Sequence, residues 1–183
     1  MKMNRLYWAR LMSCSTFLSL LKLRLTFVEF IAKKLASISD GRTPDFIVGS
    51  SDNPYLLRWF VIPRNPFFNI YLHNFRRSDD DRALHDHPWA SASVMLWGSY
   101  LEHTIQYGGI NKVERLSRGD IKVRWTGRFA HRIDLDRGDC WTVFLTGPRY
   151  RAWGFHCKNI GWVHWKKFTS PLNKGETGKG CDQ

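Results

Sequence analysis

The 183-residue sequence has few acidic residues and lacks the cysteine pairs that hold zinc ribbons. It has 16 aspartates and glutamates against 28 lysines and arginines, which gives a formal net charge of +12. The four cysteines, at positions 14, 140, 157 and 181, form no Cys-x-x-Cys pair and no disulfide framework. We therefore expect reduced thiols and a cytoplasmic protein. The excess of positive charge favours anionic partners, either a small anionic substrate or nucleic acid.

The sequence also lacks the uncharged apolar run of about 20 residues that a membrane span requires. The nearest candidate, residues 14–32, contains Lys22, Arg24 and Glu29. Residues 5–38 contain no glycine or proline and have helical periodicity. We predict an N-terminal amphipathic helical segment over residues 1–44 and no transmembrane span. Its apolar face would pack on the rest of the chain or on a second subunit, so we expect a homodimer.

Several catalytic signatures are absent. The sequence has no Gly-x-Ser-x-Gly nucleophile elbow, no phosphate-binding loop and no dinucleotide-binding glycine pattern. Cys157 directly follows His156, but neighbours on a strand face opposite ways. These features argue against serine and cysteine hydrolases, P-loop proteins and Rossmann enzymes.

Aromatic residues are abundant, with nine Trp, twelve Phe and six Tyr. Beyond residue 44, short apolar runs recur with glycine turns between them, which predicts an all-β sandwich or barrel over residues 45–169. From residue 170 the chain is polar and has no apolar periodicity, so we expect a disordered tail over residues 170–183. The ten expected strands are 56–62, 67–75, 89–97, 99–106, 112–117, 120–125, 130–136, 140–146, 153–157 and 162–168.

Three histidines form the clearest functional pattern. His85 and His87 are separated by one residue, and side chains two apart on a strand point the same way. His131 lies on a later expected strand, where Ile133 and Leu135 have the same parity. Neutral imidazole is a common ligand for iron, zinc, copper and nickel. We therefore predict that these three histidines hold one divalent transition metal.

The spacing of the first two histidines resembles the cupin superfamily. Its first motif runs Gly, five residues, His-x-His, three or four residues, Glu, six residues, Gly. His85, His87 and Gly98 match this motif, whereas Ser91 or Ala92 stands in place of the Glu. The resemblance implies an all-β fold, the cupin double-stranded β-helix or jelly-roll barrel, preceded here by the N-terminal helical segment.

The second cupin motif is matched more loosely, by Gly119, Gly127 and His131. Thr126 replaces its proline and Leu135 its asparagine. Residues 58–165 also resemble a group of uncharacterised cupin-like proteins common in bacterial and phage genomes. That likeness supports the fold and a bacterial or phage source, but it supplies no activity.

A set of three histidines without a carboxylate resembles the thiol dioxygenases, whose iron is held by three His. This implies an Fe(II)-dependent dioxygenase acting on a small anionic substrate, with Zn or Ni as alternative metals. Glu102, on the next expected strand, is the alternative fourth ligand. Because Glu102 and His103 are adjacent, only one of them can face inward. Tyr100 has the parity of Glu102 and is the candidate catalytic hydrogen-bond donor.

Arginines near the expected site are candidates for substrate binding. Arg149 and Arg151 lie in a Gly-Pro loop flanked by aromatic residues, and Arg124 precedes His131. A guanidinium binds carboxylate or phosphate in a bidentate manner, so these three arginines are the predicted substrate-binding residues. The alternative is that the loop arginines pair with the acidic loop 79–81.

Two other functions remain open. The first is a non-catalytic cupin that binds a sugar, a nucleotide or nucleic acid, and the second is a sugar-nucleotide isomerase or epimerase. A barrel that keeps its histidines only for packing and hydrogen bonding is the structural alternative to a metal site. His73, His156 and His164 lie among apolar or aromatic residues and are expected to be structural.

Overall fold

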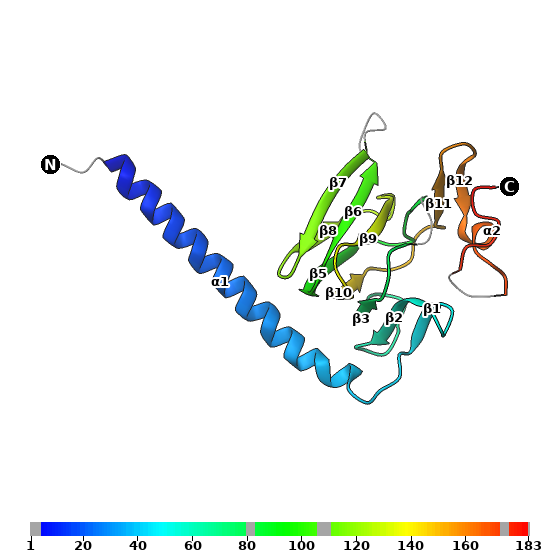
Figure 1. Cartoon of the computed structure of the whole chain (residues 1–183), viewed down its shortest axis with the longest axis horizontal. Helices are drawn as coiled ribbons and strands as arrows, with labels where there is room; N and C mark the ends of the chain where they lie inside the picture. Colours follow the sequence, from blue (N-terminus) through cyan, green and yellow to red (C-terminus); the bar gives the residue numbers. More distant parts are fainter. Residues whose placement is uncertain (1–4, 80–82, 106–110, 173–175, 183) are drawn as a thin grey trace.

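The computed structural model describes residues 5–79, 83–105, 111–172 and 176–182, with side chains from residue 16 onward. A long N-terminal helix precedes two six-stranded antiparallel sheets, and a short helix follows them (Figure 1). Residue 106, the last of the expected strand 99–106, lies outside the described residues. Within the described ranges, no helix combines the length and apolarity that a membrane-spanning segment needs.

The strand order is that of a jelly roll. One sheet runs β1-β2-β3-β10-β5-β8 and the other β12-β11-β4-β9-β6-β7, so several strands that pair, such as β3 with β10 and β4 with β9, are distant in sequence. In both sheets the strands interleave as in a double Greek key, which confirms the predicted jelly-roll barrel. The strands are β1 (Phe46–Gly49), β2 (Pro54–Phe60), β3 (Asn69–Phe75), β4 (Leu84–His85), β5 (Ser91–Trp97), β6 (Ser99–Ile105), β7 (Asn111–Ser117), β8 (Ile121–Arg124), β9 (His131–Leu135), β10 (Cys140–Thr146), β11 (Gly154–Cys157) and β12 (Gly161–His164).

The N-terminal helix α1 (Arg5–Ser39) has two different halves. Its second half packs on the first sheet, where Val28 is 1% exposed and joins a cluster with Trp59, Leu72 and Val143. Its first half projects away from the barrel (Figure 1). The apolar side chains that α1 leaves exposed include Leu20, Leu23, Phe27 and Phe30.

A second apolar cluster fills the space between the sheets. Inward-facing residues of alternating strands supply it, as the period of two along a strand requires. Tyr100 belongs to this cluster and lies beside Phe75, with a ring-centroid distance of 6.1 Å. The other buried members are Leu56, Met95, Leu116, Ile133 and Cys140.

The last expected strand, 162–168, is wrong in its second half. β12 ends at His164, and helix α2 (Trp165–Phe168) follows directly. The His164 side chain accepts a hydrogen bond from the backbone N–H of Lys166 and so caps the helix. The turn brings Phe168 into a stack with Phe155 at a centroid distance of 3.6 Å, and Phe168 is 1% exposed.

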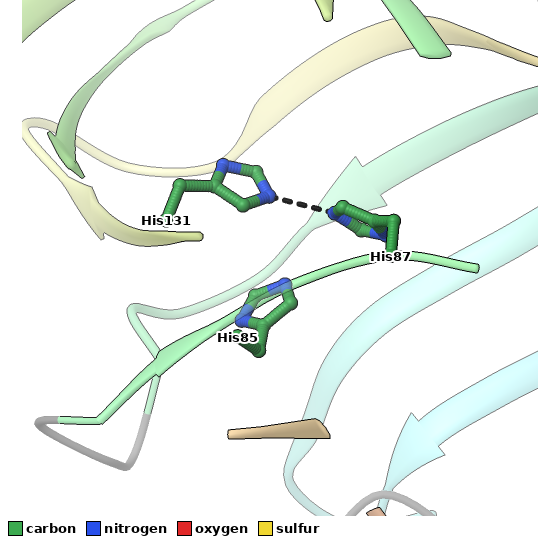
Figure 2. Close-up of side chains that lie close together, drawn as sticks. All are labelled: His85, His87 and His131. Carbon is green, nitrogen blue, oxygen red and sulfur yellow. Dashed lines mark hydrogen bonds between the residues drawn. The ribbon is translucent and has the colours of Figure 1, made fainter. Parts of the chain in front are cut away.

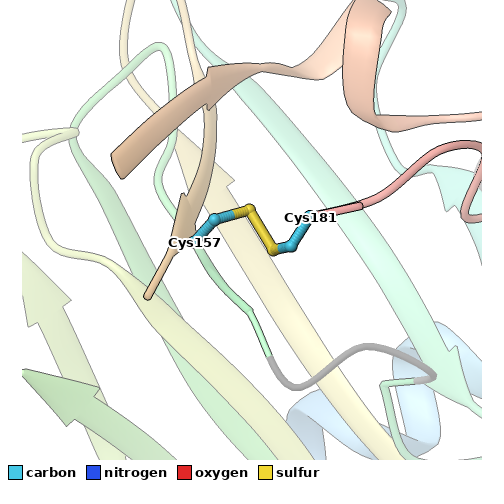
Figure 3. The surroundings of a disulfide bond; sticks show 2 residues. All are labelled: Cys157 and Cys181. Carbon is cyan, nitrogen blue, oxygen red and sulfur yellow. A yellow bond between two sulfur atoms is a disulfide. The ribbon is translucent and has the colours of Figure 1, made fainter. Parts of the chain in front are cut away.

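The expectation of reduced thiols is corrected by a disulfide between Cys157 and Cys181 (Figure 3). Cys157 ends β11, and Cys181 lies 24 residues later in the C-terminal segment. Their sequence positions resemble no common framework, so only the fold brings them together. Disulfides persist in oxidising compartments, and the cysteines therefore no longer support a cytoplasmic location.

The C-terminal segment also differs from the expected disordered tail. Residues 176–182 are described, and the Phe168 carbonyl accepts hydrogen bonds from the N–H groups of Gly178 and Gly180. A β-bridge joins Thr169 to Thr177. The polar composition of this segment does not reveal these local bonds. Together with the disulfide, they hold the segment against the barrel.

Candidate metal centre

Two paired strands bring the three histidines together. His85 on β4 pairs directly with His131 at the start of β9, and His87 follows β4 by two residues. The nitrogens that could bind a metal all lie within 4.8 Å of one another. Figure 2 shows the rings converging, with the Nε2 atoms of His87 and His131 2.8 Å apart. This cluster is the predicted histidine set.

The His-x-His segment is held by backbone bonds rather than by one regular strand. β4 contains only Leu84 and His85, and the chain then bonds to two different segments. The Asp86 N–H donates to the Gly154 carbonyl, and the His87 N–H donates to the Gly127 carbonyl. These bonds keep His85 and His87 on the same side although the strand has ended.

Asp86, between the two histidines, anchors their segment. Its carboxylate accepts hydrogen bonds from the Gly154 N–H at 2.8 Å and from Trp162 Nε1 at 3.1 Å. Arg151 Nη1 lies 2.9 Å from the same group, and His156 Nε2 lies 3.3 Å away. Asp86 is 1% exposed, so these partners replace the water that a buried carboxylate needs.

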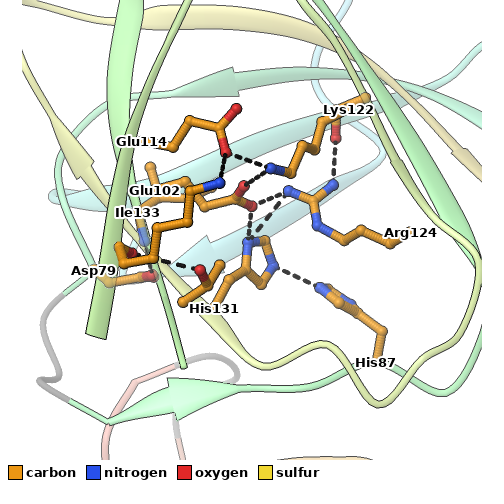
Figure 4. Close-up of polar contacts among 11 residues, drawn as sticks. Asp79, His87, Glu102, Glu114, Lys122, Arg124, His131 and Ile133 are labelled. Atoms are coloured by element: carbon orange, nitrogen blue, oxygen red, sulfur yellow. Dashed lines mark hydrogen bonds and ion pairs between the residues drawn. The ribbon is translucent and has the colours of Figure 1, made fainter. Parts of the chain in front are cut away.

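Glu102 contacts a histidine of the cluster from behind. Its Oε1 lies 2.6 Å from His131 Nδ1 and also accepts a hydrogen bond from Arg124 (Figure 4). Arg124 Nη1 donates to Ser93 Oγ at 3.2 Å, and Lys122 Nζ lies 3.6 Å from Glu102 Oε2. Glu102 is 0% exposed. Of the adjacent residues Glu102 and His103, it is therefore Glu102 that faces inward.

Burial and the neighbouring charges set the protonation states of Glu102 and His131. Burial alone would raise the pKa of Glu102, but His131 and Arg124 outweigh it and hold that pKa below its usual range. Burial, with the positive charge of Arg124, lowers the pKa of His131 to about 3. Burial, with the neighbouring histidines, likewise lowers the pKa of His87 well below its usual value. His87 and His131 are therefore neutral at physiological pH.

The donor set fits a divalent transition metal. An ionised Glu102 can only accept a hydrogen bond, so His131 carries its proton on Nδ1 and keeps a lone pair on Nε2. That Nε2 faces His87 within the cluster. A carboxylate on the far nitrogen of a ligand histidine is the usual arrangement around a protein-bound metal. Glu102 Oε1 contacts His131 and Arg124, Glu102 Oε2 lies near Lys122, and neither oxygen belongs to the cluster of candidate ligands.

The three histidines open onto a cavity of about 250 Å³ between the two sheets. Its walls are mainly aromatic and aliphatic, and they include Phe144, Trp153 and Phe155. Tyr100 also lines the cavity, and burial raises the pKa of its phenol, which therefore stays protonated.

The structure does not bring the predicted substrate arginines to this cavity. Arg149 is exposed, Arg124 is buried against Glu102, and none of the three belongs to the described residues that line the cavity. Arg151 braces the histidine loop, because its Nη1 also donates to the His87 carbonyl at 3.1 Å. The alternative pairing with residues 80 and 81 lies outside the described residues. Asp79, the described acid of that loop, accepts a hydrogen bond from the backbone N–H of Ile133.

Sequence reasoning gave Arg58 no role and expected His73 to be structural, but both lie on the cavity wall. Arg58 Nε donates to His73 Nε2 at 2.9 Å, and both side chains line the cavity. Arg58 lies on β2 two residues after Leu56, which is buried in the inner cluster. This parity was the available signal, because alternate residues of a strand share a face.

Comparisons with known proteins concern the fold alone. No family model and no curated protein matches the sequence. Similar solved structures include an oxalate decarboxylase from Bacillus subtilis, with 17% identity and a TM-score of 0.44 over 61% of this chain and 28% of that chain. KdgF from Halomonas sp. has 19% identity and a TM-score of 0.43, over 59% of this chain and 96% of that one.

A cupin superfamily protein from Desulfitobacterium hafniense is also similar, with 13% identity and a TM-score of 0.41, over 51% of this chain and 77% of the other. The chain thus spans less than a third of the decarboxylase it resembles. The protein has the jelly-roll strand order.

Proposed function

We propose that this protein is a metal-dependent enzyme, an Fe(II) dioxygenase that acts on a small anionic substrate. His85, His87 and His131 would hold the metal, with zinc or nickel as substitutes. The contact between Glu102 Oε1 and His131 Nδ1 carries the proposal. A histidine kept only for packing needs neither a buried carboxylate at one ring nitrogen nor a second imidazole at the other.

The remaining residues of the site would have distinct roles. Bound iron would supply a centre that activates dioxygen beside the substrate, and a set of three protein ligands leaves positions free for both. Glu102 would fix the orientation and protonation of His131. Tyr100 would donate a hydrogen bond within the cavity, because its raised pKa keeps the phenol proton in place.

The same protonated Tyr100 disfavours the isomerase or epimerase alternative, which needs a residue that removes a proton. A base of that kind works best with a pKa near the working pH. A neutral buried phenol is instead suited to donate. The non-catalytic binding module remains as the second candidate and is separated from the enzyme by the following experiment.

Oxygen consumption tests the proposal. Metal-free protein is loaded with Fe(II) and supplied with a panel of small thiols and carboxylic acids, while an oxygen electrode records uptake. The expected result is substrate-dependent uptake that His131→Gln abolishes and His164→Gln, a histidine outside the cluster, retains. Full iron binding without oxygen uptake on any substrate would contradict the dioxygenase and favour the binding module.

We also propose that two copies associate through α1. Leu20, Leu23, Phe27 and Phe30 are each more than half exposed, and they are spaced three, four and three residues apart. That spacing forms one stripe along a helix and is the pattern of a coiled-coil seam. Burying this stripe against a second copy would remove apolar surface from water.

Light scattering tests the association. The wild-type chain should have the mass of a dimer, and Phe27→Glu should give a monomer. Phe67→Glu serves as the control, because Phe67 is 73% exposed and lies outside the helix. A wild-type monomer at high protein concentration would remove this proposal.

A further inference from the structure

The cavity beside the histidines has one uncompensated positive charge. Arg58 is the only lysine or arginine among the described residues that line it. Its Nε donates to His73, and its guanidinium lies 4.9 Å from the Tyr71 ring centroid. Within the described chain, no carboxylate forms an ion pair with Arg58. A charge in apolar surroundings without a counter-ion is costly, unless a ligand supplies the opposite charge.

The two acidic residues of the cavity wall have other contacts. Asp79 accepts a hydrogen bond from the Ile133 N–H at 2.8 Å. Glu176 lines the cavity from the C-terminal segment, and its backbone carbonyl accepts a hydrogen bond from the Ser170 N–H. Burial lowers the pKa of Arg58 only to about 10, so the guanidinium stays charged at neutral pH.

His73 holds Arg58 in a geometry suited to an anion. Its Nε2 accepts from Arg58 Nε, and its ring stacks on Phe144 with centroids 5.1 Å apart. This contact uses only one of the five N–H donors of the guanidinium. The donors on the two Nη atoms remain for a ligand, and a carboxylate can accept from both at once.

Arg58 and the histidine cluster lie on the same cavity. Phe144 packs against His73 on one side and against His87, at a centroid distance of 5.9 Å, on the other. Trp89 also lines the cavity, and its Nε1 is buried with no hydrogen-bond partner among the described residues. A ligand held by Arg58 would therefore meet a second unused donor and the histidines.

The size and charge of the cavity narrow the ligand class. A volume of about 250 Å³ corresponds to roughly eight water molecules of about 30 Å³ each, so the ligand is small. One guanidinium balances one carboxylate. A phosphate carries up to about two negative charges, and its excess charge would be left beside Asp79 and Glu176 in an apolar cavity. Aromatic walls favour an aromatic body through stacking and edge contacts.

We propose that Arg58 is the substrate-binding residue and that the substrate is a small aromatic monocarboxylate. Arg58 binds its carboxylate, the aromatic walls hold its ring, and the reactive part faces the three histidines. This assignment rests on the proposed function for the reaction, but the binding itself requires no turnover. It moves the anion site from the predicted Arg149 and Arg151 to the inner face of β2.

Calorimetric titration with benzoate, phenylacetate and 3-phenylpropionate tests the assignment on the zinc-loaded protein. At least one acid should bind, and its neutral amide should bind at least tenfold more weakly, because the amide lacks the charge. Phenyl phosphate should also bind at least tenfold more weakly than that acid. Arg58→Gln should weaken binding of the acid at least tenfold and remove the preference for acid over amide.

Two further variants serve as controls. Arg64→Gln removes the same charge from an exposed position near Arg58 and should leave affinity for the acid within twofold. Arg58→Lys keeps the charge in the cavity but loses the bidentate contact, so it should retain part of the acid preference. Near-ultraviolet circular dichroism on each variant checks that the barrel remains folded.

The outcomes separate this inference from the proposed function. Failure of all three acids to bind zinc-loaded wild type, or equal affinity for acid and amide, would overturn the role of Arg58 and leave the metal site intact. An equal loss in Arg64→Gln and Arg58→Gln would also overturn it. Acid binding to a chain that holds no metal would instead contradict the proposed enzyme and keep the anion site.

Discussion

At the residue scale, Glu102 joins a histidine of the proposed metal centre to a buried arginine. Without Glu102, the buried guanidinium of Arg124 would lose its counter-charge and the Nδ1–H of His131 would lose its acceptor. Glu102 compensates Arg124 and at the same time fixes which nitrogen of His131 carries the proton. The same carboxylate therefore links the stability of the barrel to the geometry of the site.

Glu102→Gln tests this double role. The variant should keep the metal stoichiometry, because Glu102 supplies no ligand, but metal affinity should fall about 10-fold to 100-fold. The free energy of unfolding should fall by about 3 kcal/mol, because Arg124 loses its buried counter-charge. Metal titration and urea denaturation measure the two effects. Complete loss of metal would make Glu102 a ligand after all.

Glu114→Gln is the matched control for that variant. Glu114 contacts Lys122 and Lys112 near the surface and is more than one-third exposed. Surface ion pairs contribute about 0 to 1 kcal/mol. The control should therefore change both the stability and the metal affinity little.

His73 predicts a pH dependence of stability. Burial, with the charge of Arg58, holds the pKa of His73 well below 6.5 in the folded protein. Below about pH 6.5 the unfolded chain binds a proton that the folded chain does not, so stability falls as the pH falls. Each such histidine contributes a slope of about 1.4 kcal/mol per pH unit.

His73→Gln should remove about one proton from the difference in proton binding between the unfolded and folded chains, which lowers the slope by about 1.4 kcal/mol per pH unit. The glutamine amide oxygen can still accept the hydrogen bond from Arg58. Urea unfolding between pH 7 and pH 5, with a chelator present, measures it in both proteins. An identical slope in wild type and variant would show that His73 does not stay neutral in the folded state.

Residue patterns in the sequence predicted the histidine cluster, the shared parity of Tyr100 and Glu102, and that only one of Glu102 and His103 faces inward. These follow from a period of two, which any strand imposes. Arg58 was given no role, although its parity with Leu56 indicates the interior. Arg149 was chosen for the aromatic loop around it, and local composition does not show which loops reach the cavity.

At the scale of elements, the C-terminal segment differs most from the structure that its composition predicts. Its residues are polar, yet it supplies Thr177 and Glu176 to the cavity wall. The disulfide between Cys157 and Cys181 joins this segment to β11. A bond that spans 24 residues depends on tertiary contacts, which hydrophobic periodicity does not reveal.

Cys181→Ser should therefore lower the free energy of unfolding by about 3 kcal/mol, since the open form gains chain entropy. Urea denaturation without reductant measures the change. A thiol assay on denatured, unreduced wild type, with the labelled peptides mapped, should find Cys140 reactive and Cys157 and Cys181 unreactive. Four reactive thiols in freshly purified protein, with no stability difference in the variant, would contradict the disulfide.

At the scale of the whole molecule, the fold places three distant histidines on one cavity by pairing β4 with β9. That pairing is part of the jelly-roll order, in which strands far apart in sequence are neighbours. Regular strand spacing predicted an all-β sandwich or barrel, and the resemblance to the cupin motif implied a jelly roll. The two-residue β4 and the switch from β12 to α2 depend on local capping and backbone bonds, so the strand pattern missed them.

The central claim is that this barrel holds a metal through three histidines. Elemental analysis of the purified chain and of His85→Ala, His87→Ala and His131→Ala tests it most directly, with His164→Ala as the control. About one transition metal per chain is expected in the wild type and the control, with strong loss in each of the three variants, because two imidazoles hold a labile ion poorly. A folded wild type that contains no metal and takes up no added iron, zinc or nickel would contradict the claim.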